Sequence, residues 1–416
     1  MNTNSNPNTP TQFGRILLVT SNFPRWANDS TTPFVFHLAR DLQKLGWRID
    51  VLAPHAKGTA VREIMDGVRV ERFRYMWPSA LETVCYQGGA LINLRERKSN
   101  YFKLPALVAS EWFAIAKRLI HGKYDLLNSH WILPQGFTGT LAARPLGVPH
   151  VITVHGSDIF ALRSRLITPF KRFALKKADT VTVNSSATEK AVKEIVPNIK
   201  KLYRIPMGVS VKSSPPSPSP IELREQYRRG QGPLLIFVGR VVKEKGVEDL
   251  IRAMALLVPH FPDVSALIVG EGQDRPELEV LAKSLGLTDC IIFCGWISPE
   301  LVPNYLSAGD IFIGPSWIEA QGLSIIEAML AQTPVIASRV GGIVDIVEDK
   351  ITGLLVNKCA PAEIAEAIEK IIYDPELAQR IRTNGRKKAE TEFSREASAI
   401  AFSELFLRTI QESKRR

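Results

Sequence analysis

The sequence predicts an α/β protein of two domains, each with a parallel sheet covered by helices on both faces. Three observations lead to this prediction. Short apolar runs alternate with amphipathic stretches, which is the order of elements in a doubly wound sheet. A Ser- and Pro-rich break interrupts the alternation at residues 212–220, and the same alternation resumes after it. At 416 residues, the chain is long enough for two such domains.

The elements of the first half follow from its apolar pattern. Residues 16–20 predict a buried strand, residues 33–45 an amphipathic helix with Pro33 in its first turn, and residues 49–52 a second strand. Helical patterns separate the further predicted strands, which cover residues 68–73, 126–127, 151–154 and 180–183. We therefore expect a first domain over residues 14–205, after a disordered lead over residues 1–13.

The second half repeats this order after an expected linker over residues 206–232. A helix is predicted at residues 247–257, and the predicted strands cover residues 234–238, 266–269, 291–293, 311–313, 335–336 and 354–356. These elements form an expected second domain over residues 233–393. A last helix within residues 394–416 has no strand after it and is expected to pack back on the first domain. Open parallel sheets bind ligands beyond the carboxyl ends of their strands, so a site is expected in a cleft between the domains.

The charge of the chain is distributed unevenly. Residues 1–205 carry 29 Lys and Arg against 14 Asp and Glu, whereas residues 206–416 carry 24 against 28. The basic half predicts an anionic partner for the first domain, the alternative being a charge that serves only solubility. Nucleic acid is not an expected partner, because no recognition motif accompanies the charge.

The composition excludes several other classes of protein. Hydrophobic residues at 45% and charged residues at 23% are ordinary for a globular chain. The 4 Cys form no C-x-x-C pair, which disfavours a disulfide scaffold or a zinc ribbon and fits a reducing cytosol. The start lacks the basic and apolar segments of a signal peptide, and no run approaches the roughly 18 apolar residues of a spanning helix. The expected location is cytoplasmic, with at most a peripheral contact to a membrane.

The loop after strand 234–238 carries the first chemical signal. It reads GRVVKEKG over residues 239–246, so Arg240 and Lys245 can place two cations near a helix N-terminus. A guanidinium fork, an ammonium and a positive helix end together suit a diphosphate. A nicotinamide site is disfavoured, because the Gly270-x-Gly272 pair has Arg275 at the third glycine position.

The second signal is a pair of carboxylates separated by seven residues, Glu319 and Glu327. Glu319 precedes a predicted helix, Gly322 breaks the pattern, and Glu327 lies about one turn inside the helix. Exposed amides around residues 320–323 would form a donor cluster at the helix start. Carboxylates bind sugar hydroxyls well, because each oxygen accepts several hydrogen bonds. The alternative is two solvated helix carboxylates.

The segment Glu319 to Gly342, EAQGLSIIEAMLAQTPVIASRVGG, resembles the signature of the retaining glycosyltransferases of family 4, the "group 1" family with the GT-B fold. Residues 239–246 resemble its phosphate-binding element, and His155-Gly156-Ser157-Asp158 its histidine motif. The order and spacing agree over roughly residues 14 to 407. The resemblance implies a GT-B architecture, two doubly wound Rossmann-like domains facing across a cleft.

The resemblance also implies roles for individual residues. Arg240 and Lys245 would hold the nucleotide diphosphate and Glu327 the ribose. Glu319 would bind the donor sugar, with the amides of Gln321, Gly322 and Leu323 nearby. His155 would lie beside the reacting centre. The base pocket would be lined by Gly270, Gly272, Trp296 and Ile297, and Asp158 and Thr32 are candidates on the acceptor side.

Two departures from the family pattern affect this assignment. Many members carry a Gly-Gly pair after the first strand, where this chain has Ser30-Thr31-Thr32-Pro33. Thr31 or Thr32 as N-cap would still give a helix start. The family often has Asn-Gly-Val-Asp before the linker, and here Met207 and Ser210 replace the two polar residues of that motif.

The expected reaction is transfer of a sugar from a UDP- or GDP-linked donor to a glycan or lipid-linked acceptor, with retention. No metal and no other cofactor is expected, because the sequence has no Asp-x-Asp pair to hold an ion on the diphosphate. Fixed cations would replace the metal. A sugar-nucleotide epimerase of the same fold and a non-catalytic carbohydrate- or membrane-binding protein are the alternatives.

The acceptor side is predicted from charge alone. A basic, amphipathic stretch after the histidine motif could lie on an anionic membrane surface, and a helix that packs on its own domain is the alternative. The expected membrane contacts in this stretch are Arg163, Arg165, Lys171, Arg172, Lys176 and Lys177. A second basic stretch, with Arg95, Arg97, Lys98 and Lys103, lies near Tyr101 and Phe102.

Overall fold

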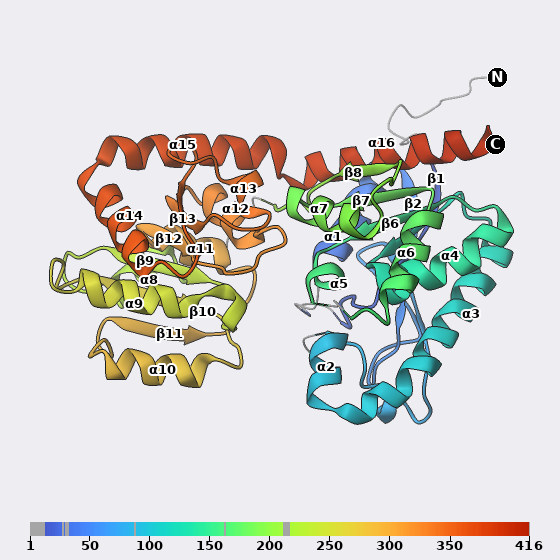
Figure 1. The fold of residues 1–416 in the computed structure, drawn as a ribbon, viewed down its shortest axis with the longest axis horizontal. Coiled ribbons are helices and arrows are strands. Elements are labelled where there is room, and N and C mark those ends of the chain that lie inside the picture. The colour runs from blue at the N-terminus through green and yellow to red at the C-terminus, as the bar shows by residue number, and fades with distance from the viewer. Residues whose placement is uncertain are drawn as a thin grey trace, which may run out of the picture. The chain divides into compact units, whose positions relative to one another are not determined.

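A computed structural model describes residues 13–26, 29, 33–86, 89–161, 164–210 and 217–415. The chain forms two compact units. Unit 1 comprises Met1–Asn184, Thr188–Gly208 and Arg395–Arg416, and unit 2 comprises Ser185–Ala187 and Val209–Ser394. Each unit contains one sheet flanked by helices (Figure 1), as the alternation of apolar runs and amphipathic stretches predicts.

Unit 1 contains a sheet of eight strands in the order β3-β4-β2-β1-β5-β6-β7-β8. All neighbouring pairs are parallel except β3 with β4. The strands are β1 (Gly14–Val19), β2 (Trp47–Pro54), β3 (Arg62–Met65), β4 (Val68–Phe73), β5 (Leu126–His130), β6 (His150–Val154), β7 (Thr180–Val183) and β8 (Leu202–Arg204). The sequence pattern does not predict β3 and β8, because these short edge strands carry polar residues and lack a buried apolar run.

Helices cover this sheet, and α3 and α4 pack on one face of it. Leu17 and Val19 of β1 share a core with Leu107 and Ile115 of α3. The helices are α1 (Pro33–Lys44), α2 (Ala90–Glu96), α3 (Leu104–Gly122), α4 (Phe137–Ala143), α5 (Ser157–Phe160), α6 (Thr168–Lys177), α7 (Ser186–Ile195) and α16 (Arg395–Lys414). Shorter turns are η1 (Ser79–Leu81), η2 (Lys98–Lys103), η3 (Ile132–Gly136) and η4 (Arg144–Leu146).

The last helix, α16, belongs to unit 1 although unit 2 precedes it in the chain. Trp47 Nε1 donates to Ser403 Oγ at 2.8 Å, and the Arg395 guanidinium lies 2.6 Å from a carboxylate oxygen of Asp41 on α1. Phe402 and Phe406 are fully buried, and the Phe406 ring meets Trp47 edge-on. Helix α16 is therefore part of the unit 1 core.

Unit 2 contains a sheet of six parallel strands in the order β11-β10-β9-β12-β13-β14. They are β9 (Leu234–Val238), β10 (Ser265–Val269), β11 (Ile291–Gly295), β12 (Ile311–Gly314), β13 (Val335–Ser338) and β14 (Leu354–Val356). The flanking helices are α8 (Pro220–Tyr227), α9 (Val247–Leu257), α10 (Arg275–Ser284), α11 (Val302–Ala308), α12 (Leu323–Leu330), α13 (Ile343–Ile346), α14 (Pro361–Tyr373) and α15 (Pro375–Glu392), with the turn η5 (Lys243–Lys245). One apolar core contains side chains of α9, α10 and α14, and the other contains side chains of α8, α11 and α12.

The segment expected to be a linker contains helix α8. Ser219 caps it reciprocally with Glu222, and Leu223 is buried in the core of unit 2. Residues 211–216, most of the Ser- and Pro-rich break, lie outside the described residues.

Replacing Phe406 with Ala should lower the free energy of unfolding of unit 1 by about 3–5 kcal/mol, because it removes a buried ring and leaves a cavity. Ile400→Ala on the same helix is the matched control, since Ile400 is 49% exposed. Urea unfolding followed by fluorescence measures both variants. Equal losses in the two variants would mean that α16 does not stabilise unit 1 through its buried face.

Candidate active site

In unit 2, the candidate residues lie in loops at the carboxyl ends of four neighbouring strands. In the sheet, β10 and β11 lie on one side of β9, and β12 to β14 lie on the other side. The strand order therefore reverses at β9. Parallel sheets of this kind bind ligands at such a point. The loops after β9 and β12 carry Lys245 and Glu319.

Glycines hold the loops after β9 and β10 together. A Cβ on Gly270 would stand 1.9 Å from the Gly239 carbonyl oxygen, and a Cβ on Gly272 would stand 2.0 Å from that of Val241. Only glycine permits such close backbone approach. Gly270 N–H also donates to the Gly295 carbonyl at 2.8 Å. The predicted base-pocket residues Gly270 and Trp296 are thus brought together.

The loop after β12 is attached to the loop after β9. Trp317 N–H donates to the Glu244 carbonyl at 2.8 Å, and Trp317 Nε1 donates to an Asp249 carboxylate oxygen at 2.6 Å. Gly246 has a φ of +65°, and a Cβ there would stand 2.0 Å from the Pro315 carbonyl oxygen. These contacts fix the segment that leads to Glu319.

Glu319 is held from its other side by the glycine pair after β13. Gly342 N–H donates to the Glu319 carbonyl at 3.1 Å. Gly341 has a φ of +54°, and a Cβ on it would stand 1.8 Å from the same carbonyl oxygen. The glycine pair of the signature segment therefore has a steric purpose, because it lets the loop after β13 touch the loop that carries Glu319.

These contacts bring the two main candidates into direct contact. Lys245 Nζ donates to Glu319 Oε2 at 2.5 Å, with side chains that are 20% and 13% exposed. Arg240 is exposed on the same loop, and no ion pair of its guanidinium occurs within the described residues. In a partly shielded ion pair of this kind, the ammonium can exchange its carboxylate partner for an anionic ligand.

Helix α12 begins next to this ion pair. Gly322 is its N-cap, with a φ of +102°, and provides no side chain to cap the first amides. Gln321 is buried, Leu323 packs against the core, and Glu327 lies half-buried one turn into the helix. Glu319, the helix start and Glu327 therefore lie along one short stretch of chain, and Lys245 reaches Glu319 from the loop after β9.

The turn after β11 completes the set of predicted donor residues. Trp296 is 61% exposed, whereas Ile297 packs against the core of unit 2. Gly270 is bridged to Gly295, the residue before Trp296, at the carboxyl ends of β10 and β11.

In unit 1, His155 follows β6 and contacts a second histidine that the sequence pattern did not single out. His130 ends β5, and its Nδ1 lies 2.8 Å from His155 Nε2, so one ring donates to the other. The rings are stacked with an interplanar angle of 10°, and Phe34 and Trp131 pack on His155. Burial lowers the pKa of His155 to about 3 and holds the pKa of His130 well below its ordinary value. Both rings are neutral at neutral pH.

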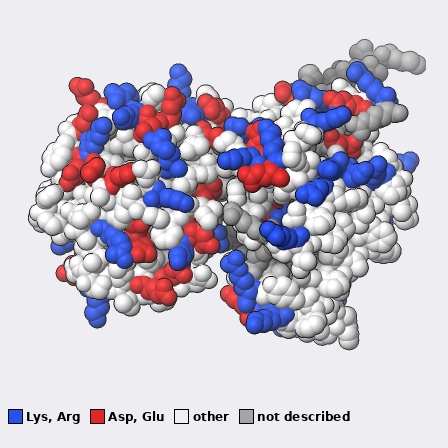
Figure 2. Space-filling view, in the orientation of Figure 1, with Lys and Arg blue, Asp and Glu red and all other residues white. Residues whose placement is uncertain are grey.

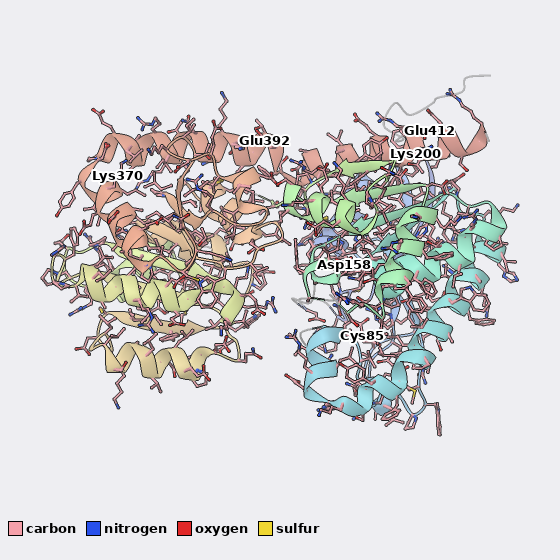
Figure 3. The ribbon with its side chains drawn as sticks, in the orientation of Figure 1. Cys85, Asp158, Lys200, Lys370, Glu392 and Glu412 are labelled. Carbon is pink, nitrogen blue, oxygen red and sulfur yellow. The ribbon has the colours of Figure 1, made fainter. Side chains whose placement is uncertain are left out.

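Asp158 does not present its carboxylate to an acceptor. The side chain is buried and accepts N–H groups of Ile132 at 2.8 Å and Gly156 at 3.0 Å (Figure 3 labels the residue). Burial raises the pKa of this carboxyl group. Asp158 therefore fixes the loop that carries His155, and the predicted acceptor contact is wrong.

Lys171 was expected at a membrane surface, and this prediction is also wrong. Its side chain is 2% exposed, and its Nζ donates to the Asp158 carbonyl. It faces inward because α6 packs this side of the helix on the His155 loop. Arg165, Arg172, Lys176 and Lys177 are exposed, whereas Thr32 and Arg163 lie outside the described residues.

Two sets of functional candidates were missed from sequence. His130 ends the strand of which only residues 126–127 were predicted, because Asn128, Ser129 and His130 are polar although fully buried. The Trp317–Asp249 bond was missed because it joins the loop after β12 to the first turn of α9, 68 residues away in the chain. Within the described residues, no group of three or more His, Cys, Asp or Glu side chains could hold a metal ion, and no helix is long and apolar enough to cross a bilayer.

Two family models match the chain, "Glycosyl transferases group 1" over residues 220–388 and "Glycosyltransferase Family 4" over residues 32–213. An alpha-D-kanosaminyltransferase from Streptomyces kanamyceticus is 32% identical over 270 residues, which are 62% of this chain and 70% of that protein. Sucrose-phosphate synthase from Thermosynechococcus elongatus has a TM-score of 0.79 at 26% identity, covering 96% of this chain and 100% of the other. Anabaena HepE in complex with UDP-glucose has a TM-score of 0.71 at 21% identity, with the same coverage.

The two parallel-sheet domains and the loops at their strand ends define a transferase with the GT-B fold. The chain belongs to the group 1 glycosyltransferases of family 4, as the segment from Glu319 to Gly342 predicts.

Replacing Gly341 with Ala should reduce sugar transfer by about a hundredfold, because the new Cβ pushes the Glu319 loop out of place. Gly286→Ala is a matched control, since Gly286 also has a positive φ, +72°, but has no atom within 4 Å of the added Cβ. The control should lose only about 1–2 kcal/mol of stability and keep its activity. Equal activity in the two variants would contradict the proposed steric role of Gly341.

The buried histidines predict a loss of stability in acid. Between pH 6.5 and about 3 the unfolded rings bind protons and the folded rings do not, so stability falls as the pH falls. His130→Asn keeps an amide at the position of Nδ1 and removes one titrating group. The slope of unfolding free energy against pH should decrease by about 1.4 kcal/mol per pH unit below pH 6.

Urea unfolding of unit 1 at pH 6 and pH 5 measures this slope. His121→Asn, on the exposed end of α3, is the matched control for exchanging histidine for asparagine. If the slope of unfolding free energy against pH is the same in His130→Asn as in the wild type, the His130 ring is protonated in the folded state.

Proposed function

We propose that this glycosyltransferase takes its sugar from a nucleoside-diphosphate donor, whose diphosphate is bound by Arg240 and Lys245. The Lys245–Glu319 ion pair supports this proposal most strongly, because it places an exchangeable cation at the carboxyl edge of β9 and β12. The exposed Arg240 guanidinium and the uncapped start of α12 add two further partners for an anion. The HepE structure with UDP-glucose is consistent with this type of donor on the same fold.

The donor would contact three neighbouring parts of unit 2. Glu327 would bind the ribose hydroxyls, Glu319 the sugar hydroxyls, and the amides of Gln321 to Leu323 the sugar or the distal phosphate. The base would lie at the turn of Trp296 and Ile297, against the close-packed Gly270 and Gly272. His155 would act as a neutral hydrogen-bonding group, because burial keeps its pKa at about 3.

Departure of the nucleoside diphosphate would be driven by fixed positive groups, with retention at the anomeric carbon. Preorganised donors and cations stabilise charge that develops on a leaving group without reorganising during the reaction. The lack of an Asp-x-Asp pair supports transfer without a metal ion. An epimerase would convert the donor with no acceptor present, and a binding protein would leave it intact, so analysis of the products distinguishes both from a transferase.

The acceptor is a glycan or a lipid-linked sugar at the cytoplasmic face of a membrane, which the protein would meet peripherally. The net charge of residues 1–205 and the exposed cations Arg165, Arg172, Lys176 and Lys177 support an anionic surface as partner.

Lys245→Ala should weaken the affinity for UDP or GDP by about tenfold or more, since it removes a charge-assisted contact to the diphosphate. Lys243→Ala is the matched control, because Lys243 is exposed in the same turn. Calorimetric titration with each nucleotide measures the affinities, and turnover should persist in EDTA. Strict dependence on added magnesium or manganese would contradict the metal-free mechanism.

Glu319→Ala and Glu327→Ala should fail in different ways. Glu327→Ala should lower the affinity for the free nucleoside diphosphate, because it removes the ribose contact. Glu319→Ala should not lower that affinity, because it frees the Lys245 ammonium for the diphosphate, and it should lower the rate of transfer, because it removes a sugar contact. If Glu319→Ala lost nucleotide affinity as severely as Glu327→Ala, the two assignments would be wrong.

A further inference from the structure

An uncharged helical surface covers part of unit 1. Glu111 is the single charged residue within residues 104–116 of α3, it is buried, and α4 has none. Large apolar side chains are exposed there, including Phe102 at 89%, Phe113 at 63% and Trp112 at 44%. Figure 2 shows a broad area without Lys, Arg, Asp or Glu where Figure 1 places α3 and α4. Such patches on a soluble domain mark interaction sites.

This surface contains an apolar groove between η2, α3 and α4. The groove has a volume of about 580 Å³ and is lined by Tyr101, Leu104, Pro105, Val108, Trp112 and Leu141. Aromatic side chains beside a groove of aliphatic ones suit the boundary between lipid headgroups and acyl chains.

Cations border the groove at the end of α4. Arg144 follows Leu141 by three residues, so the two side chains lie on neighbouring positions of one helical surface. Arg144 lines a second depression of about 860 Å³ together with Lys176, Lys177, Lys200 and Lys201. Lys201 is paired with Glu412, whereas the other four cations have no acidic partner within the described part of the chain.

The one carboxylate of this depression is already engaged. Asp179 accepts the N–H of His150 at 3.0 Å. Two more cations, Arg97 and Lys98, are exposed at the start of η2, the turn whose Tyr101 lines the groove, and the exposed Glu96 precedes them. The apolar surface therefore has cations near η2 and at the end of α4.

We propose that this surface, defined by the groove residues and by Arg144, Lys176, Lys177 and Lys200, docks on an anionic phospholipid bilayer. Acyl chains occupy the groove, Phe102 and Trp112 insert at the headgroup level, and lipid phosphates occupy the basic depression. A second copy of this chain fits less well, because its cations would meet cations of the same kind. This inference rests on the membrane contact in the proposed function and replaces the predicted contact at Lys171 by aromatic residues of η2 and α3.

The test is co-sedimentation of the full chain with vesicles of phosphatidylcholine with and without phosphatidylglycerol. The wild type should bind the anionic vesicles and be released by high salt. Phe102→Ser/Trp112→Ser and Lys176→Glu/Lys177→Glu should each lose about tenfold or more in binding. Matched controls from unit 2, Val280→Ser/Tyr373→Ser and Lys283→Glu/Lys387→Glu, should bind as the wild type does.

Titration with UDP or GDP separates this inference from the proposed donor site. All four variants should bind the nucleotide with wild-type affinity, because the changes lie outside the donor loops. A wild type that ignores anionic vesicles at low salt would overturn the docking surface, whatever its nucleotide affinity. Light scattering that finds a dimer in the wild type and a monomer in Phe102→Ser/Trp112→Ser would likewise overturn it in favour of a second copy.

Discussion

The ion pair between Lys245 and Glu319 is the interaction on which the proposed donor site depends. Its two residues come from loops 74 residues apart, and each loop is held by backbone contacts that only glycine permits. Gly246 lets the first loop touch the strand end before Glu319, and Gly341 lets a third loop touch the Glu319 carbonyl. Without a ligand the two charges neutralise each other, and a diphosphate would compete with the carboxylate for the ammonium.

The fold of both domains was predictable because buried parallel strands are continuous apolar runs. Runs such as residues 234–238 have the bounds of β9, and Pro33 begins α1 as predicted. Strands β3 and β8 were not predictable in this way, since their pairing with β4 and β7 comes from tertiary context. Helix α8 was missed because a Ser- and Pro-rich segment hides a capping box that starts at Ser219.

The candidate site was predictable where its residues are neighbours in the sequence. It was not predictable where segments far apart in the sequence come into contact. Glu319, Gly322 and Glu327 lie on one strand-loop-helix segment, and its sequence pattern is sufficient to group them. His130 and Asp249 act through partners in other loops, and no sequence spacing indicates those contacts. Lys171 and Asp158 show the converse limit, because a charged residue in a basic or polar segment gives no sign of its burial. Which face of α6 is buried, and with it Lys171, is known only once the helix is packed on unit 1.

A double-mutant cycle on nucleotide affinity tests the central claim most directly. Calorimetry would compare UDP and GDP binding to the wild type, Glu319→Gln, Lys245→Ala and the double variant. If the ion pair competes with the diphosphate, Glu319→Gln frees the ammonium and tightens nucleotide binding, and this gain disappears when Lys245 is Ala. If Glu319→Gln instead weakens binding by the same factor with and without Lys245, the two residues act independently and the account of the donor site is wrong.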